Sequence, residues 1–243
     1  MERVLLSVIV PAYNEEQRLP DSLRRIVGYL GKQGYTSEVI VVDDGSEDGT
    51  AQVVEEMMTE LPILSLIRTE HRGKGHAVKR GMRAGRGEYL FICDADLSMP
   101  IEELYKFLPP VLEGYDVAIA SREIPGAHRY DEPSHRHFMG RVFNWIVRLF
   151  AVRGFEDTQC GFKCFRREAA RDVFTYQTMD GWGFDVEVLF IAQKRGYKIV
   201  EVPIDWYYSA NSRVHPVRDS VGMFTEVIKI RLNDWRGRYR KRE

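Results

Sequence analysis

The chain has 243 residues, of which 44% are hydrophobic and 29% charged, and this predicts a globular protein with a sizeable core rather than a disordered or fibrous one. Its 35 Lys and Arg residues nearly match its 36 acidic residues, so the overall charge does not indicate a nucleic-acid partner. No apolar run is long enough to span a bilayer and the N-terminus lacks the pattern of a secretory signal, so we expect a cytoplasmic protein.

Strands and helices are predicted to alternate along the chain. Apolar, β-branched runs predict strands, and apolar residues at helical spacing predict helices between them. The expected strands are 4–10, 39–42, 63–67, 89–93, 116–121, 160–165 and 198–202. This alternation predicts an α/β fold with a mostly parallel sheet flanked by helices. The loops after the parallel strands then share one edge of the sheet.

An acidic triplet, Asp94-Ala95-Asp96, follows the strand 89–93. Ligands bind beyond the carboxyl ends of strands in open α/β sheets, and carboxylate oxygens suit a hard divalent cation. Taken alone, two acids in a loop are more typical of a solvated turn or a helix N-terminus. The neighbouring loops therefore decide between these interpretations.

Acidic residues also follow the first two strands. Glu15 lies in the first loop, and Asp43 and Asp44 end the second strand. The chain has no P-loop sequence, and its first loop, 11–15, lacks the glycines of a dinucleotide fingerprint. An acid-rich edge is typical of a site that binds a nucleotide whose diphosphate is bridged by a metal. The alternative is that these acids only form turns.

Four motifs in order carry a resemblance to a known family: SVIVPAYNE (7–15), VVDDGSEDGT (41–50), RGKGH (72–76) and DADLSMP (94–100). With them, the chain closely resembles family 2 of the GT-A-fold inverting glycosyltransferases, from about residue 7 to residue 231. DTQCGFK (157–163) and GWGFDVE (181–187) are most similar to the branch that glycosylates polyprenyl phosphates, the dolichyl-phosphate β-glucosyltransferases in particular. Relatives often carry a transmembrane helix at one end, which this chain is not predicted to have.

The resemblance implies a single domain over 1–243 whose first half, 1–122, binds a UDP-sugar. Arg72 and Lys74 would lie near the diphosphate. The residues expected at the nucleobase, ribose or sugar are Pro11, Ala12, Tyr13, Glu15, Asp43, Asp94 and Ala95.

The resemblance also implies a Mg²⁺ or Mn²⁺ ion bound by Asp96 together with Asp94. Related mannosyltransferases tend to have Gln where this chain has Ser98. A third protein ligand is therefore left open, and Ser98 is alternatively expected to cap the helix that begins at Pro100.

The second half, 123–215, is expected to bind a polyprenyl or dolichyl phosphate. Arg122 follows the strand 116–121 at the same edge, where the alternative is an ordinary surface charge. By the resemblance, the arginines that would contact the acceptor phosphate are Arg122, Arg136, Arg141 and Arg213.

Two further acids belong to the implied catalytic set, which comprises Asp96, Asp157, Arg122 and Asp185. Asp157 would face the acceptor phosphate or the metal, and its alternative role is to form a turn. Asp185 stands where other family members have a catalytic base, and its alternative role is to stabilise a helix N-terminus.

Two basic segments indicate contact with an anionic membrane surface. Residues 134–154 interleave four arginines with aromatic residues and contain no acid, and 229–243 contains seven Lys or Arg against two acids. Such a pattern fits a helix packed on the sheet or a helix lying in a membrane interface. We expect the C-terminal basic amphipathic helix, 216–243, to contribute to peripheral association with the cytoplasmic face of a membrane.

The predicted reaction is metal-dependent transfer of a hexose, glucose by resemblance, from a UDP-sugar to a polyprenyl phosphate with inversion. A phosphate oxygen is already ionised at neutral pH, so arginines that position it replace a general base. The alternatives are a sugar-hydroxyl acceptor with Asp185 or Asp157 as base, a mannosyl or GlcNAc donor, and a nucleotide-sugar-binding or membrane-scaffold protein without activity.

Overall fold

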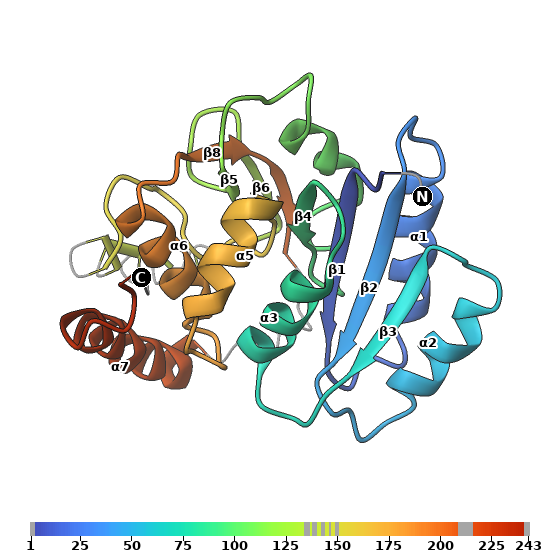
Figure 1. Cartoon of the computed structure of the whole chain (residues 1–243), viewed down its shortest axis with the longest axis horizontal. Coiled ribbons are helices and arrows are strands. Elements are labelled where there is room, and N and C mark those ends of the chain that lie inside the picture. Colours follow the sequence, from blue (N-terminus) through green and yellow to red (C-terminus); the bar gives the residue numbers. More distant parts are fainter. Residues whose placement is uncertain are drawn as a thin grey trace.

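The computed structural model of the chain describes residues 3–133, 137, 140–141, 144–145, 147–148, 151–208 and 216–240 (Figure 1). Its main feature is a seven-stranded sheet in the order β3-β2-β1-β4-β7-β5-β8. The strands are β1 (Leu6–Ala12), β2 (Ser37–Asp43), β3 (Leu64–Arg68), β4 (Tyr89–Ile92), β5 (Val117–Ser121), β7 (Lys163–Arg166) and β8 (Ile199–Pro203). The helices are α1 (Leu19–Leu30), α2 (Thr50–Met58), α3 (Lys74–Ala84), the 3-10 helix η1 (Ile101–Phe107), α5 (Arg167–Tyr176), α6 (Phe184–Lys194) and α7 (Pro216–Trp235).

The sheet is parallel except at β7, so the mostly parallel α/β fold predicted from the sequence is confirmed. Strand β1 pairs in parallel with β2 and β4, and β5 pairs in parallel with β8. Strand β7 lies between β4 and β5 and runs antiparallel to both. The chain that enters β7 therefore lies at the edge where β4 and β5 end, which brings residues 157–162 beside residues 94–96 and 122.

Two hydrophobic cores cover the two faces of the sheet. Successive residues of a strand point to opposite faces, so Val8 and Val10 of β1 join one core and Ile9 joins the other. Helices α1, α2 and η1 pack on the first core, and α3, α5 and α6 on the second. Burial on both faces explains why these strands are continuous apolar runs in the sequence.

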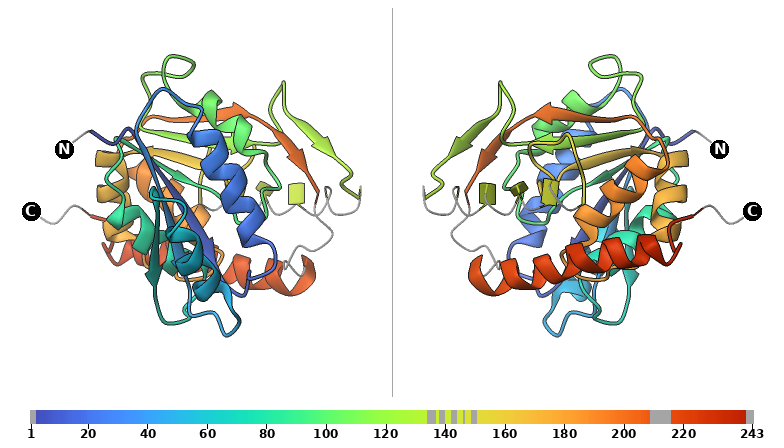
Figure 2. Two further views of the ribbon diagram at one scale, coloured as in Figure 1. Left: turned by 90° about the vertical axis from the view of Figure 1, so that its right-hand side faces the viewer. Right: turned by 90° about the vertical axis from the view of Figure 1, so that its left-hand side faces the viewer.

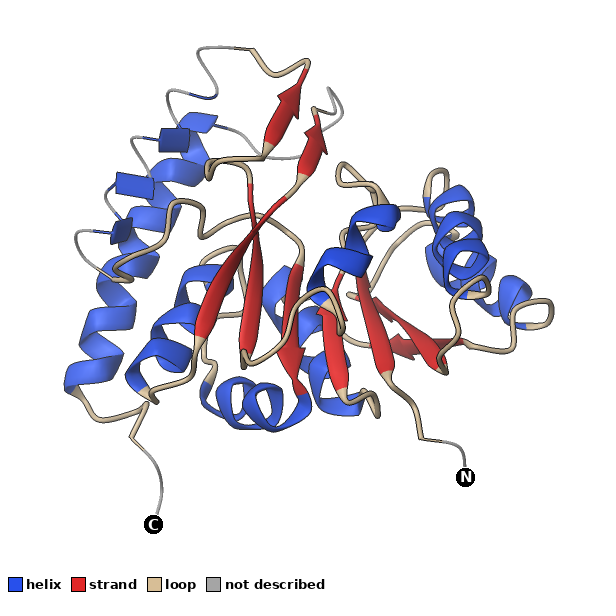
Figure 3. Cartoon of the chain, turned by 90° about the horizontal axis from the view of Figure 1, so that it is seen from above, coloured by secondary structure: helices blue, strands red, loops and turns tan. Residues whose placement is uncertain are grey.

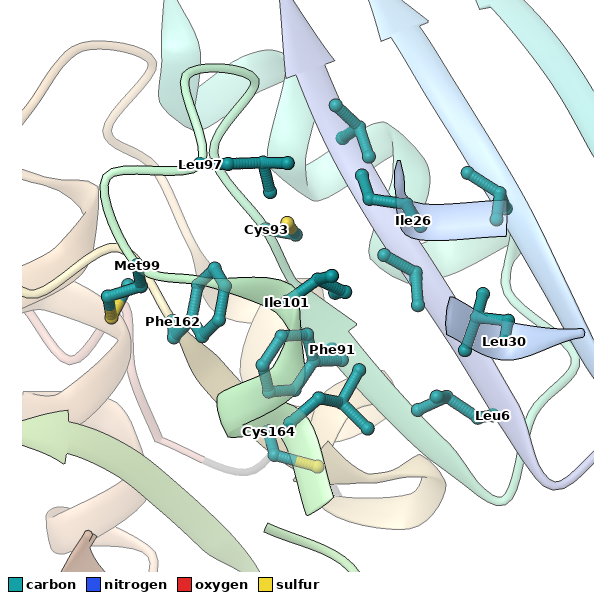
Figure 4. Packing of buried hydrophobic residues seen from close by; sticks show 14 of the residues in the cluster. Leu6, Ile26, Leu30, Phe91, Cys93, Leu97, Met99, Ile101, Phe162 and Cys164 are labelled. Atoms are coloured by element: carbon teal, nitrogen blue, oxygen red, sulfur yellow. The ribbon is translucent and has the colours of Figure 1, made fainter. Parts of the chain in front are cut away.

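The loop after β4 is anchored in the first core by every second residue. Ala95, Leu97, Met99 and Ile101 are buried, and Figure 4 shows Leu97 near Cys93, Met99 beside Phe162 and Ile101 beside Phe91. The residues between them are only partly buried. This alternation holds the loop firmly while its acidic side chains remain accessible at the sheet edge.

A second sheet consists of two short strands, β6 (His128–Tyr130) and β9 (Asp205–Tyr207), which pair in parallel beside the main sheet (Figure 3). Tyr130 and Tyr207 stack with ring centroids 4.6 Å apart. His128 Nδ1 lies 2.9 Å from an Asp205 carboxylate oxygen. The segment that follows β5 is thereby held next to the segment that follows β8.

The three cysteines are free thiols and all are buried. Within the ranges given above, no helix combines the length and apolar character needed to cross a bilayer.

Candidate active site

The acidic loop after β4 meets Lys74 at the start of α3. Lys74 Nζ lies 2.6 Å from Asp94 Oδ1 and 5.2 Å from the centre of the Trp182 ring. Burial alone would lower the pKa of Lys74, but nearby carboxylates, Asp94 first among them, outweigh it and raise that pKa above its usual value. Lys74 is therefore a fixed positive charge at the acidic edge.

The second acid of the triplet is held by its own loop. The Ser98 N–H donates to Asp96 Oδ1 at 3.0 Å, and Leu97 between them has a left-handed φ of 47°. The expectation that Ser98 caps the helix at Pro100 is wrong, because η1 has no side-chain cap. The Ser98 carbonyl instead accepts the Tyr207 N–H at 2.8 Å, which ties the loop to β9.

The carboxylates at this edge fit a divalent cation whose other ligands include a phosphate group. Burial, and then the charge of Asp94, raise the pKa of Asp96 above its usual value. Among the described residues, no group of three or more His, Cys, Asp or Glu side chains is placed to hold a metal. Mg²⁺ is typically bound by one or two carboxylates together with substrate phosphates. Asp94 and Asp96 are two carboxylates of the kind that such a site requires.

A glycine allows the segment that precedes β7 to approach the acidic loop closely. A Cβ atom added to Gly161 would lie 1.9 Å from Asp94 Oδ2. The backbone at Gly161 therefore lies against the Asp94 carboxylate.

The loops after β1 and β2 lie next to each other and hold Tyr13, Glu15 and Asp43. The Glu15 N–H donates to Thr50 Oγ1 at 2.7 Å, and the buried Asp43 carboxylate accepts the Ser46 N–H at 3.1 Å. Pro11 pairs with Val42 and Ala12 with Asp43 in the register of β1 and β2. The predicted donor-binding residues of the first two loops therefore form one continuous part of the sheet edge.

Two further residues lie near these loops: Arg18, which was not anticipated from the sequence, and Asp44, which was expected at this edge with a turn as its alternative role. The Glu15 carboxylate binds Arg18 through two hydrogen bonds, and the charges of Asp96 and Asp94 contribute to raising the Arg18 pKa after the larger effect of Glu15. The buried Asp44 accepts the backbone N–H groups of Arg72 at 3.2 Å and Gly73 at 2.7 Å. Asp44 therefore shapes the loop before α3, and the acidic pair at 43–44 was its only sequence signal.

The loop before α3 packs against the segment that precedes α6. Arg72 Nε and Nη2 lie 3.1 Å and 2.5 Å from Asp180 Oδ2. A Cβ atom on Gly73 would lie 2.6 Å from the Asp180 carbonyl oxygen, and one on Gly75 would lie 2.6 Å from the Met179 carbonyl oxygen. The lack of a side chain at these two glycines permits this packing. Tyr13 stacks on His71 of the same loop, with ring centroids 4.0 Å apart.

At the end of β5, the partly buried Arg122 and the buried Asp157 form a bidentate ion pair. Arg122 Nε and Nη2 donate to the two Asp157 oxygens at 2.6 Å and 3.0 Å, and the Arg122 N–H donates at 3.1 Å. Burial alone would raise the pKa of Asp157, but Arg122 outweighs it and lowers that pKa to about 2. The guanidinium also lies 5.3 Å from the centre of the Trp206 ring. Arg122 is thus held rigidly at the edge.

Of the other three predicted acceptor arginines, Arg141 is the one that the structure describes. Arg141 is exposed, and its Nη1 lies 3.4 Å from Glu123 Oε2. Arg136 and Arg213 lie outside the described residues. A further arginine, Arg129, binds Glu123 and lies 5.7 Å from the centre of the Trp206 ring, on which Arg122 also packs.

Asp185 lies at the start of α6 in a fully buried ion pair. Lys163 Nζ donates to Asp185 Oδ1 at 2.5 Å and to the Cys160 carbonyl oxygen at 2.6 Å. Burial raises the pKa of Asp185 against the opposing effect of Lys163. The contact favours a structural role for Asp185, and Lys163 was not anticipated, since a lysine in a strand usually indicates a solvent-facing position.

The model of the glycosyl transferase family 2 matches residues 7–174. The chain belongs to this family. The dolichyl-phosphate β-glucosyltransferase of Dictyostelium discoideum is 35% identical over 246 residues, which cover 96% of this chain and 75% of the relative. The enzyme of the same name from Drosophila melanogaster is 39% identical over 246 residues, covering 93% of this chain and 74% of the relative. The resemblance inferred from the motifs is confirmed.

The family 2 assignment agrees with the fold. A crystal structure of glucosyl-3-phosphoglycerate synthase from Mycobacterium tuberculosis in complex with Mn²⁺, UDP and phosphoglyceric acid matches with a TM-score of 0.66 at 20% identity, covering 99% of this chain and 80% of that one. The predicted GT-A fold is thereby confirmed, and the prediction of a glycosyltransferase is confirmed by the family.

Proposed function

We propose that this family 2 glycosyltransferase transfers glucose from UDP-glucose to a polyprenyl or dolichyl phosphate, with inversion and with a divalent metal ion. One observation carries the proposal: a carboxylate pair suited to a cation and a rigid arginine suited to a phosphate lie on the same edge of the sheet. The similarity to dolichyl-phosphate β-glucosyltransferases supports this donor and acceptor.

The first half, 1–122, would bind the donor. Asp96 and Asp94 would hold Mg²⁺ or Mn²⁺, which when bound offsets the negative charge of a departing diphosphate. Lys74, already fixed beside Asp94, adds a second positive charge at the same place. The loops that contain Tyr13 and Asp43 would orient the nucleoside.

The second half, 123–215, together with Arg122, would bind the acceptor. The pair with Asp157 uses Nε and Nη2 of Arg122 and not Nη1. A phosphate oxygen needs no deprotonation at neutral pH, so the work of Arg122 is to position it behind the anomeric carbon. The burial of Asp185 against Lys163 supports a phosphate acceptor over a hydroxyl acceptor, because a hydroxyl would require an available base.

A panel of donors and acceptors tests the proposal. Transfer is expected with UDP-glucose and a short polyprenyl phosphate in Mg²⁺ or Mn²⁺. The rate should be lower when GDP-mannose or UDP-GlcNAc replaces the donor, and when a sugar hydroxyl replaces the acceptor. EDTA should abolish transfer. Asp96→Asn should lower turnover on the order of 100-fold, whereas Glu102→Gln, at an exposed pair with Arg25, should leave it unchanged. Transfer to a hydroxyl but not to the lipid phosphate, or transfer that persists in EDTA, would overturn the proposal.

A further inference from the structure

Helix α7 turns an apolar row of side chains toward solvent. Ile228, Leu232 and Trp235 are 44%, 39% and 86% exposed. They are four and three residues apart, so they form one stripe along the helix. A different row, which includes Val227 and Ile230, is buried against the body of the protein. The apolar stripe is therefore not needed for the core.

Positive charges flank the stripe on both sides. At roughly 100° per residue, Lys229 and Arg236 lie on one side of it and Arg231 on the other. All three are exposed. From 225 to 240, a stretch in which every residue is described, the exposed side chains are basic, apolar or Thr225, and none is acidic.

The two acids of that stretch have partners within the protein. Asp234 binds Lys194 of α6. Glu226 accepts a hydrogen bond from the Gly183 N–H. Neither carboxylate offsets the positive charge around the stripe.

Side-chain hydrogen bonds hold the end of α7 to the body of the protein. Asn233 Nδ2 donates to Thr178 Oγ1 at 3.0 Å, and the Tyr239 hydroxyl donates to the buried Glu187 carboxylate at 2.6 Å. Figures 1 and 2 show α7 toward the same end of the molecule as the carboxyl ends of β1 and β2, where the candidate active site lies. The stripe is thus presented on a fixed element near that site.

We infer that this surface docks the protein onto an anionic lipid bilayer. The docking surface is defined as Ile228, Lys229, Arg231, Leu232, Trp235 and Arg236. Apolar and Trp side chains enter the interfacial layer, while flanking cations contact anionic headgroups. A second copy of the chain is a poorer occupant, because a two-fold contact would bring these cations together. The inference goes beyond glycosyl transfer and needs no acceptor lipid in the bilayer.

Co-sedimentation of the full chain with phosphatidylcholine vesicles, with and without phosphatidylserine, tests the inference. The protein should bind the vesicles that contain phosphatidylserine and bind those without it much more weakly. Neutralising the three cations in Lys229→Gln/Arg231→Gln/Arg236→Gln should weaken binding on the order of 100-fold, which corresponds to about 1 kcal/mol for each cation. Trp235→Glu should weaken it by more than about tenfold.

Two controls separate docking from folding and from self-association. Tyr105→Ser and Arg24→Gln remove an exposed aromatic ring and an exposed cation elsewhere, and should leave vesicle binding unchanged. All variants should keep the wild-type circular dichroism spectrum and transfer to a short acceptor in detergent. The inference is overturned if binding of the wild type does not depend on phosphatidylserine or if the docking-surface variants bind as well as the wild type. It is also overturned if the substitutions act by dispersing an oligomer. Because the vesicles lack acceptor lipid, loss of docking and loss of glycosyl transfer are distinguishable.

Discussion

Two ion pairs, each with a buried carboxylate, lie at the centre of the candidate site, and each fixes a residue whose role is ambiguous from the sequence alone. Arg122 binds Asp157, and Lys163 binds Asp185. A buried charge is costly unless a partner and hydrogen bonds compensate it, so removing one partner should be far more damaging than removing both.

Lys163→Met should destabilise the protein by about 3 to 5 kcal/mol, because it leaves Asp185 buried without its cation. Lys163→Met/Asp185→Leu should recover most of that loss and, if Asp185 is structural, should retain transfer to a polyprenyl phosphate. Urea unfolding and initial-rate measurements check both statements. A stable double variant without activity at any pH would instead show that Asp185 takes part in the reaction.

Asp157 should make stability depend on pH in the acid range. Its pKa is lowered from an ordinary 3.8 to about 2, so its contribution is complete above pH 3.8 and is lost as the pH falls toward about 2. The pH-dependent part corresponds to about 2 kcal/mol. In urea unfolding, the advantage of wild type over Asp157→Asn should shrink by that amount between neutral and strongly acidic pH. Glu55→Gln, at an exposed pair with Arg68, should show no such trend.

At this scale, the sequence was informative about residue types and uninformative about partners. Asp94, Asp96, Asp157 and Arg122 could be placed at one edge, because each borders a predicted strand. Their pairing could not be predicted, because Asp157 follows Arg122 by 35 residues and meets it only through the antiparallel course of β7.

At the scale of elements, the contact between the acidic loop and β7 determines the geometry of the site. The loop is anchored by alternate apolar residues, which the sequence displays, and the strands of the parallel sheet were predicted close to their observed positions. The reversed direction of β7 was not predictable from its own residues, because a buried strand has the same apolar pattern in either direction.

Gly161→Ala should disturb this contact directly. The added Cβ would lie 1.9 Å from Asp94 Oδ2 and would push that carboxylate from its place beside Lys74. A displacement of about 1 Å at an active-site group typically lowers the rate on the order of 100-fold. Metal-dependent turnover is the measurement, and Gly28→Ala is the matched control, because a Cβ there meets nothing within 4 Å. Equal activity of the two variants would mean that Asp94 has no fixed role.

At the scale of the whole molecule, the two functional halves share one sheet. Strand β7, from the second half, is inserted between β4 and β5 of the first, and β8 completes the edge beside β5. Neither half can bury its strands without the other. The boundary at 122 that separates donor and acceptor residues in the sequence is therefore not a boundary between folding units.

We accordingly expect one cooperative unfolding transition. All four tryptophans, Trp145, Trp182, Trp206 and Trp235, lie after residue 122, so their fluorescence follows residues 123–243. Far-ultraviolet circular dichroism follows the helices and strands of the whole chain. The two signals should give the same midpoint in urea, because loss of β7 removes the partner of β4 at the same time. Arg24→Gln, at an exposed pair on α1 in the first half, should leave the two curves superimposed. Fluorescence that changes at a lower urea concentration than circular dichroism would show that 123–243 unfolds on its own, which the shared sheet forbids.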